Sequence, residues 1–153
     1  SMLRKRDVPG YLAMIDRGAT TTWEHWAGDR SRIHNCFNGI GAWFVQALGG
    51  IRPDERDPGY RHILFRPQTP AGIRWVRATK ETPYGTAAID WEIAEGRFAA
   101  DIVVPANSTA TFFLPDGVRT CELDGRTTET PDGRVALAAG RHTLACATGH
   151  GSR

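Results

Sequence analysis

The fold is decided by the stretch Thr86-Ala-Ala-Ile-Asp-Trp-Glu-Ile-Ala-Glu-Gly-Arg-Phe-Ala-Ala-Asp-Ile-Val-Val104. Apolar residues recur at every second position on both sides of Glu95-Gly96, and this period is typical of strands with one buried face. The dipeptide Glu95-Gly96 supplies a turn between the two runs. The stretch therefore predicts a β-hairpin whose buried face carries Ala87, Ile89, Trp91, Ile93, Phe98, Ala100, Ile102 and Val104.

Shorter alternating segments extend this pattern over the second half of the chain. Asp-Gly, a dipeptide that tight hairpin turns favour, occurs three times between them, beginning at Asp116, Asp124 and Asp132. About eight short antiparallel strands in roughly 95 residues predict a β-sandwich, with Trp75 and Trp91 in its core. The additional strands are expected at residues 60–66, 74–80, 110–114, 119–123, 134–138 and 142–146.

The first fifty residues follow a helical period instead. Pro9 suits the first turn of a short helix, and Gly18 provides its end. A second, longer helix ends at Gly49-Gly50, and we expect Trp43 on this helix to be buried. The intervening residues 18–32 predict an irregular loop. Spacings of three and four define the apolar stripe of the second helix, which consists of Phe37, Ile40, Gly41, Phe44, Val45 and Leu48.

Composition restricts the class of protein. The chain has 153 residues, of which 41% are hydrophobic and 24% charged, and its net charge is +2, as in an ordinary globular protein. Acidic and basic residues are interspersed, and the single basic cluster Arg4-Lys5-Arg6 fits a solvated tail, so we expect no nucleic-acid partner. Apolar runs are too short to cross a bilayer, so we expect no membrane partner. The sequence assigns no compartment.

Cysteines and histidines give no evidence for a cofactor. Cys36, Cys121 and Cys146 are odd in number and widely spaced, which favours free buried thiols, although a bridge between Cys121 and Cys146 remains open. His142, Cys146 and His150 follow a spacing of four, which on a strand does not suit a compact tetrahedral site. We therefore expect neither a metal nor another cofactor.

One motif carries chemistry. In the run Gly18-Ala-Thr-Thr-Thr-Trp-Glu-His-Trp26, the carboxylate of Glu24 lies between two indoles and next to His25. Indoles offer apolar faces to sugar rings, and a carboxylate held by rigid neighbours can orient a water molecule. The alternative is a surface carboxylate paired with Arg30 or Arg32. For Trp23 and Trp26, contact with a sugar and packing within the protein are likewise both open.

Several motifs, in order and nearly end to end, resemble the C-terminal part of bacterial α-L-rhamnosidases, glycoside hydrolases that remove terminal L-rhamnose with inversion. The resemblance implies that residues 1–50 are the last helices of an (α/α)₆ barrel catalytic domain, of the six-hairpin glycosidase type, and that residues 51–148 are the C-terminal β-sandwich. The motifs are the run from Pro9 to Trp26, His34 before Gly39-Ile-Gly-Ala-Trp-Phe44, Gly50-Ile-Arg-Pro-Asp54, Pro58-Gly-Tyr60, Thr82-Pro-Tyr-Gly85, Trp91 and Pro105-Ala-Asn-Ser-Thr-Ala110.

The resemblance also implies roles for single residues. Glu24 matches the general base of the family, which activates the attacking water, and His34 matches a histidine that contacts rhamnose. The alternative for His34 is a core histidine satisfied by backbone. Ile33 stands where the family usually has Asn. Rhamnosides or rhamnose-containing glycans are the partners implied, with Trp23 and Trp26 as further candidate contacts.

The general acid of the family has no match in this sequence, and two or three helices cannot close a twelve-helix barrel. We therefore expect the isolated chain to lack rhamnosidase activity. The missing barrel portion is an expected partner, and apolar faces around Phe37, Phe44 and Leu48 suggest self-association as an alternative. Two other functions remain open, a carbohydrate-binding module and a purely structural sandwich.

Overall fold

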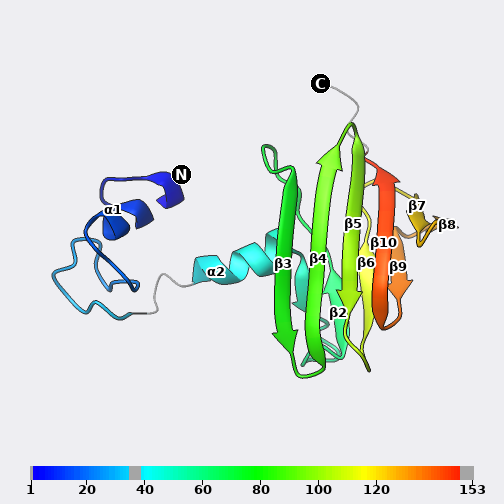
Figure 1. The fold of residues 1–153 in the computed structure, drawn as a ribbon, viewed down its shortest axis with the longest axis horizontal. Coiled ribbons are helices and arrows are strands. Elements are labelled where there is room, and N and C mark those ends of the chain that lie inside the picture. Colours follow the sequence, from blue (N-terminus) through cyan, green and yellow to red (C-terminus); the bar gives the residue numbers. More distant parts are fainter. Residues whose placement is uncertain (1, 35–38, 149–153) are drawn as a thin grey trace. The chain divides into compact units, whose positions relative to one another are not determined.

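The structure, a computed structural model, describes residues 2–34 and 39–148. The chain forms two compact units, residues Ser1–Trp43 and Phe44–Arg153. Figure 1 shows the helices of the first unit and the two sheets of the second. The sandwich predicted from the alternating pattern is confirmed. Among the described residues, no helix combines the length and apolar character needed to cross a membrane.

In its described residues, 2–34 and 39–43, the first unit contains three short helices and a long irregular loop. The helices are η1 (Met2–Arg4), α1 (Tyr11–Asp16) and α2 (Gly39–Trp43). Gly18 ends α1 as predicted, with a φ of 83°. Its N–H donates to the Ile15 carbonyl at 2.8 Å, and the next N–H donates to the Met14 carbonyl at 3.0 Å. This is the Schellman arrangement, which satisfies the last carbonyls of a helix.

The second predicted helix ends in a π-helical turn, η2 (Phe44–Leu48), which belongs to the second unit. Gly49 and Gly50 end it as predicted. Gly50 has a φ of 72°, and a Cβ there would lie 2.2 Å from the Pro67 nitrogen, so this position requires glycine. Leu48 is buried, whereas Phe44 is 41% exposed. Trp43 is 42% exposed in α2, so its predicted burial is wrong for this structure. Phe37 lies outside the described residues, and self-association stays a prediction.

Within residues 44–148, ten strands form the two sheets of the second unit. The four-stranded sheet has the order β1-β2-β6-β9, and the six-stranded sheet has the order β3-β4-β5-β10-β7-β8. Their bounds are β1 (Ile51–Pro53), β2 (His62–Phe65), β3 (Trp75–Thr82), β4 (Gly85–Ala94), β5 (Arg97–Val104), β6 (Thr109–Phe113), β7 (Thr120–Leu123), β8 (Arg126–Glu129), β9 (Arg134–Leu137) and β10 (Gly140–Ala147).

The predicted hairpin becomes β4 and β5, and it supplies the centre of the core. Glu95 and Gly96 both have positive φ, 51° and 75°, as a two-residue turn between twisted strands requires. Trp91 is fully buried, and its ring stacks on Phe98 with centroids 5.9 Å apart. The indole N–H of Trp91 donates to the carbonyl of Leu48 at 2.8 Å, which joins η2 to the core.

The sandwich differs from the prediction in three respects. β2 and β6 pair in parallel, although an all-antiparallel fold was expected. β1 and β8 were missed, because three residues are too few to show a period and Arg-Thr-Thr-Glu contains no apolar residue. Trp75 begins β3, an edge strand, on its outward face and is 66% exposed, so its predicted burial is wrong. Of the three Asp-Gly dipeptides, only the one at Asp124 joins two consecutive hairpin strands.

Candidate functional site

The loop that follows α1 is organised by its own backbone. The Glu24 N–H donates to the Ser31 carbonyl at 2.8 Å, and the His34 N–H donates to the Thr22 carbonyl at 2.9 Å. The hydroxyls of Thr21 and Thr22 donate to the carbonyls of Arg32 and His34. Residues 21–24 and 31–34 therefore run side by side. This pairing brings the two predicted site residues, Glu24 and His34, into one narrow strip.

The Glu24 carboxylate is lightly engaged. Its Oε2 accepts the Ser31 N–H at 3.3 Å, and its Oε1 lies 4.0 Å from the Arg30 Nη1. The Glu24 side chain is 36% exposed and that of Arg30 is 68% exposed, so their ion pair contributes little to stability. The Arg30 contact agrees with the surface-pair alternative and leaves the carboxylate accessible to solvent, and a role of Glu24 in orienting water stays a prediction.

His25 does not share the Glu24 carboxylate. Its Nδ1 lies 2.5 Å from the Oδ1 of Asp29. The hydrogen bond to His25 lowers the pKa of Asp29, an exposed carboxylate. His25 is therefore engaged with Asp29 in the far turn of the loop and not with the Glu24 carboxylate.

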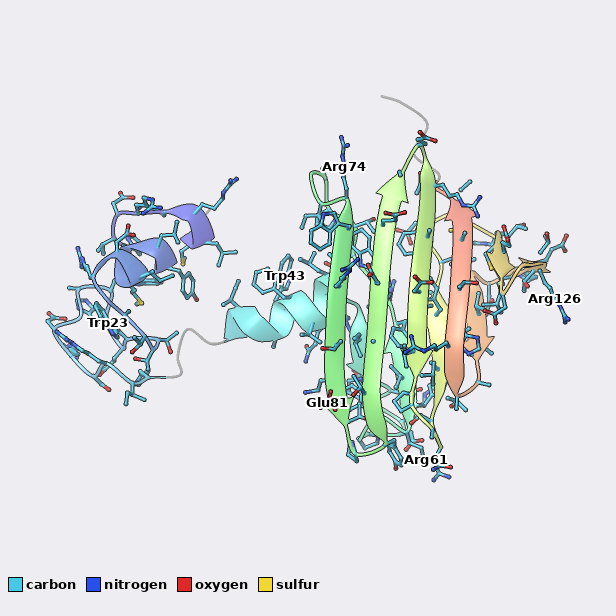
Figure 2. All side chains as sticks on the ribbon, viewed as in Figure 1. Trp23, Trp43, Arg61, Arg74, Glu81 and Arg126 are labelled. Atoms are coloured by element: carbon cyan, nitrogen blue, oxygen red, sulfur yellow. The ribbon has the colours of Figure 1, made fainter. Side chains whose placement is uncertain are left out.

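The two tryptophans of the motif have different surroundings. Trp23 is 5% exposed and lies inside the loop (Figure 2), with the Arg32 guanidinium 5.3 Å from its ring centroid. Trp26 is half-buried and meets Tyr11 edge to face at 5.4 Å. The packing alternative therefore holds for Trp23 in this conformation. A sugar contact by either indole stays a prediction.

Gly28 shapes the loop that holds Glu24, and the sequence alone does not single it out. Its φ is 75°, and a Cβ there would lie 2.4 Å from the Trp23 ring. The glycine allows the loop to fold over the indole and hence to hold Glu24 on the opposite limb. A glycine five residues after a tryptophan is a weak sequence signal for such packing. Only the close approach of Gly28 to the Trp23 ring in the structure shows that this position requires glycine.

His34 is exposed at the end of the described loop, where its N–H is bonded to Thr22. The alternative of a buried core position for His34 is therefore wrong, because its side chain is exposed. Ile33 before it is 80% exposed. Contact of His34 with a sugar stays a prediction.

A groove of about 590 Å³ lies on the outer face of the four-stranded sheet. Its floor combines Leu64, Thr111 and Ala136, which lie in one row across β2, β6 and β9. Charged side chains surround this floor, and the sequence reading did not single them out. They are Arg52, Asp54, Glu55, Arg56, Asp132 and Arg134.

Four side-chain contacts involve residues that line the groove. The guanidinium groups of Arg66 and Arg134 lie 5.3 and 5.4 Å from the ring centroid of Phe113. The two ring nitrogens of His62 lie 2.7 Å from the Thr109 Oγ1 and 3.0 Å from the Thr111 Oγ1. These interactions engage His62, Phe113 and Arg134, three of the residues that line the groove. Polar residues on the outward face of a strand show no sequence pattern that would reveal such a groove.

The histidine–cysteine spacing does not build a metal site in the described part of the chain. Both ring nitrogens of His142 are engaged, Nδ1 with the Asp124 Oδ2 at 2.9 Å and Nε2 with the Ala138 carbonyl at 3.0 Å. Within residues 2–34 and 39–148, no three His, Cys, Asp or Glu side chains form a group that could hold a metal ion. His150 lies outside the described residues.

Comparison with known proteins identifies the two halves of the chain. Residues 50–129 match the family model of the bacterial alpha-L-rhamnosidase C-terminal domain, and residues 1–48 match that of the bacterial alpha-L-rhamnosidase 6 hairpin glycosidase domain. An alpha-L-rhamnosidase of Formosa agariphila is 32% identical over 125 residues, which cover 74% of this chain and 13% of that protein. One from Streptomyces avermitilis is 30% identical over 125 residues, 74% of this chain and 12% of the relative.

Solved structures agree with these matches. The Streptomyces avermitilis alpha-L-rhamnosidase complexed with L-rhamnose superposes with a TM-score of 0.74 at 27% identity, over 95% of this chain and 15% of the other. The Aspergillus terreus enzyme gives a TM-score of 0.73 at 26% identity, over 96% and 17%. The chain thus spans about an eighth of the length of its curated relatives. It belongs to the bacterial α-L-rhamnosidase family of glycoside hydrolases and corresponds to their C-terminal part.

Proposed function

We propose that Glu24 is the general base of an inverting α-L-rhamnosidase and that this chain supplies the base without the acid. In this proposal residues 1–50 are the end of the barrel catalytic domain, and residues 51–148 are the sandwich that follows it. The observation that carries the proposal is that the Glu24 backbone is held in place while its carboxylate remains accessible to solvent. Its backbone N–H is tied to Ser31 at 2.8 Å, while its side chain remains 36% exposed.

Inversion needs two carboxyl groups on opposite sides of the sugar, roughly 6.5–9.5 Å apart, with room for water beside the base. Glu24 would accept a proton from that water as the water oxygen bonds to the anomeric carbon. The glycosidic bond breaks at the same time, and the general acid protonates the departing oxygen. A carboxylate with one backbone donor and a distant arginine keeps acceptor sites for the water.

The acid would come from the parent enzyme outside this chain. Asp16 and Asp29 are the nearest spare carboxylates in the sequence, and both are engaged. Asp16 accepts from Arg6 at 2.8 Å, and Asp29 lies 2.5 Å from His25. The isolated chain is therefore expected not to hydrolyse an aryl α-L-rhamnoside. Turnover by the isolated chain that is lost in Glu24→Gln would contradict the proposal.

Rhamnosides are the proposed substrates. The Streptomyces avermitilis relative was solved in complex with L-rhamnose, and this chain follows its fold. His34 lies on the limb paired with that of Glu24, so its ring is the proposed donor to a rhamnose hydroxyl. Trp26, half-buried beside Tyr11, is the proposed apolar contact. Trp23 would support the loop from within.

A chimera provides the test. Residues 2–148 would replace the matching C-terminal segment of the Streptomyces avermitilis enzyme, which restores a complete barrel. In this background we expect Glu24→Gln to lower kcat by about 10²- to 10⁴-fold with little change in KM, as for loss of a general base. Proton NMR of the first sugar released reports whether the anomeric configuration is inverted.

Asp29→Asn is the matched control, because it removes an exposed carboxylate from the same loop. It should retain activity within a few fold. Equal losses in both variants would mean that the loop is merely sensitive to substitution, and a retained anomer would exclude inversion. His34→Ala is expected to raise KM more than it lowers kcat.

A second candidate function, glycan binding by the sandwich, is favoured by the groove on the four-stranded sheet. Its volume of about 590 Å³ lies within the range of roughly 300–1,000 Å³ for ligand sites. The apolar floor fits the methyl-bearing face of a deoxysugar, and the surrounding guanidinium and carboxylate groups can bond vicinal hydroxyls. In this reading Arg52, Asp132 and Arg134 orient the sugar.

Chemical-shift mapping with methyl α-L-rhamnoside tests this second function. Perturbations at Leu64, Thr111 and Ala136 that vanish in Ala136→Trp would support it, since the indole fills the groove. Ala147→Trp, on an exposed alanine of the other sheet, is the control and should leave the perturbations unchanged. No perturbation in the wild-type chain would leave the sandwich with a structural function.

A further inference from the structure

Two free thiols lie on neighbouring strands of the six-stranded sheet. Cys121 belongs to β7 and Cys146 to β10, and both are buried, with 3% and 6% of their surface exposed. Both side chains belong to the same core cluster between the sheets. They therefore share one face of the sheet as well as one pair of strands.

The strand register places the two cysteines opposite each other. β10 pairs with β7 through Leu144 opposite Leu123 and Ala145 opposite Glu122. One further step along both strands sets Cys146 opposite Cys121. The sequence alone leaves a bridge between these cysteines open, and the strand register supplies a geometric reason for it.

The hydrogen-bond pattern defines the type of this pair. The Asp124 N–H donates to the Thr143 carbonyl at 2.9 Å, and the Thr143 N–H donates to the Asp124 Oδ1 at 2.8 Å, so these two residues occupy a hydrogen-bonded position of the ladder. Such pairs alternate with non-hydrogen-bonded ones along an antiparallel ladder, so Cys121 and Cys146, three steps away, form a non-hydrogen-bonded pair. Their Cα atoms are then about 4.5 Å apart. Disulfides span roughly 4.4–6.8 Å between Cα atoms, so the strands need not move.

We propose that Cys121 and Cys146 form a cross-strand disulfide site that is closed by a small disulfide such as oxidised glutathione. One thiolate attacks the small disulfide, forms a mixed disulfide and releases one glutathione thiol. The second thiolate then attacks the protein sulfur of the mixed disulfide and releases the second glutathione. The two cysteines lose two protons and two electrons, and one oxidised glutathione becomes two thiols.

The surroundings of the thiols make closure slow in the folded chain. Burial, with a smaller effect of Cys121, raises the pKa of Cys146 to about 11, and burial also raises the pKa of Cys121. The thiolate is the attacking species, so little of it exists at neutral pH. Access requires local opening of the β7–β8 hairpin, which lies at the end of the strand order beyond β10 (Figure 1). Small edge hairpins are among the elements that open most readily.

Closure would tie this edge hairpin to the central strands. Arg126 lies at the far end of the hairpin (Figure 2), at its turn, and Thr120–Leu123 is the only stretch that pairs the hairpin with β10 in the described part of the chain. A covalent bond inside that stretch removes the local opening and restricts the unfolded chain. The redox conditions around the protein then decide how firmly the sheet edge is held.

The test uses the Cys36→Ser chain, which has only these two thiols. It is unfolded and refolded in oxidised glutathione, and its thiols are counted before peptide mapping. We expect no remaining thiol, one peptide pair joined through Cys121 and Cys146, and a melting temperature raised by on the order of 5–15 °C. In folded protein, closure should accelerate as the pH is raised.

A second variant serves as the control. Cys36→Ser with Cys121→Ser should form only a mixed disulfide, and its melting temperature should not rise. The proposal is overturned if the two-cysteine chain keeps both thiols, if it carries glutathione on them, or if closure lowers its melting temperature.

Discussion

The two units of the chain differ in how they are stabilised. Among the described residues, eighteen buried side chains form one core between the sheets of the sandwich. In the described part of the first unit, three apolar residues are buried, namely Ala13, Met14 and Trp23. Its loop is held by backbone and hydroxyl hydrogen bonds instead. The sandwich therefore specifies its own structure through its core, whereas the described part of the region with the candidate base has little core of its own.

Removal of Trp91 should have the largest effect on this contrast. Trp91→Ala empties a fully buried site and leaves the Leu48 carbonyl without its donor, so we expect a loss of about 3–5 kcal/mol in unfolding free energy. Trp75→Ala, at a 66% exposed position, should change it by less than about 0.5 kcal/mol. Denaturant unfolding followed by circular dichroism measures both. Similar losses would show that burial in the sandwich is not what stabilises it.

Substitution of Gly28 tests the first unit. Gly28→Ala combines a positive φ with a Cβ 2.4 Å from the Trp23 ring, and we expect a local loss of about 2 kcal/mol or more. Gly18→Ala is the matched control, since its φ is also positive but nothing lies within 4 Å, and about 1 kcal/mol is expected. Hydrogen exchange at the Glu24 and His34 amides reports the difference. Equal protection in both variants would mean that the Trp23 contact does not organise the loop.

A smaller effect of pH is expected in the sandwich. Burial lowers the pKa of His142, but hydrogen bonds with Asp124 and the Ala138 carbonyl outweigh it and raise the pKa above its ordinary value. Both partners are acceptors, so only the imidazolium satisfies both. With the folded pKa raised, this stabilisation is present below pH 6.5 and is lost as the pH rises through the folded value.

We expect the melting temperature of the sandwich to fall by roughly 1–5 °C over that interval, as for loss of one hydrogen bond. His142→Gln should remove the dependence. Differential scanning calorimetry at a series of pH values measures it, and an unchanged slope in the variant would assign the dependence to another group.

The smallest effect should come from removing the first unit. A chain of residues 44–153 retains every member of the core cluster, so its melting temperature should lie within about 2 °C of that of the full chain. A large drop would show that the first unit contributes to the sandwich core, and the contrast between the units would fail.

The sequence predicted the sandwich where its signal was repeated and missed it where the signal was short or absent. β4 and β5 follow from eight alternating apolar residues, whereas β8 is polar throughout and is recognised only because it pairs with β7. Trp75 shows the limit of propensity, since residue type favours a strand but does not determine which face is buried.

The candidate site also has a part that the sequence predicts and a part that it does not. Glu24 and His34 were found through a motif and a family resemblance, and their proximity depends on hydrogen bonds between residues twelve apart or fewer. The arrangement of Gly28 under Trp23 and the groove around Leu64 both depend on distances in space. No periodicity encodes them, so neither could be predicted from the sequence.

The bond between the Trp91 indole and the Leu48 carbonyl affects where such domains can be exchanged between enzymes. A recombination point after Gly50 would transfer the sheets without the helical turn, and a buried donor would lose its acceptor. A junction before Phe44 carries the turn along. Successful domain swaps in this family should therefore take the last turn of the preceding helix with the sandwich, as one transferable piece.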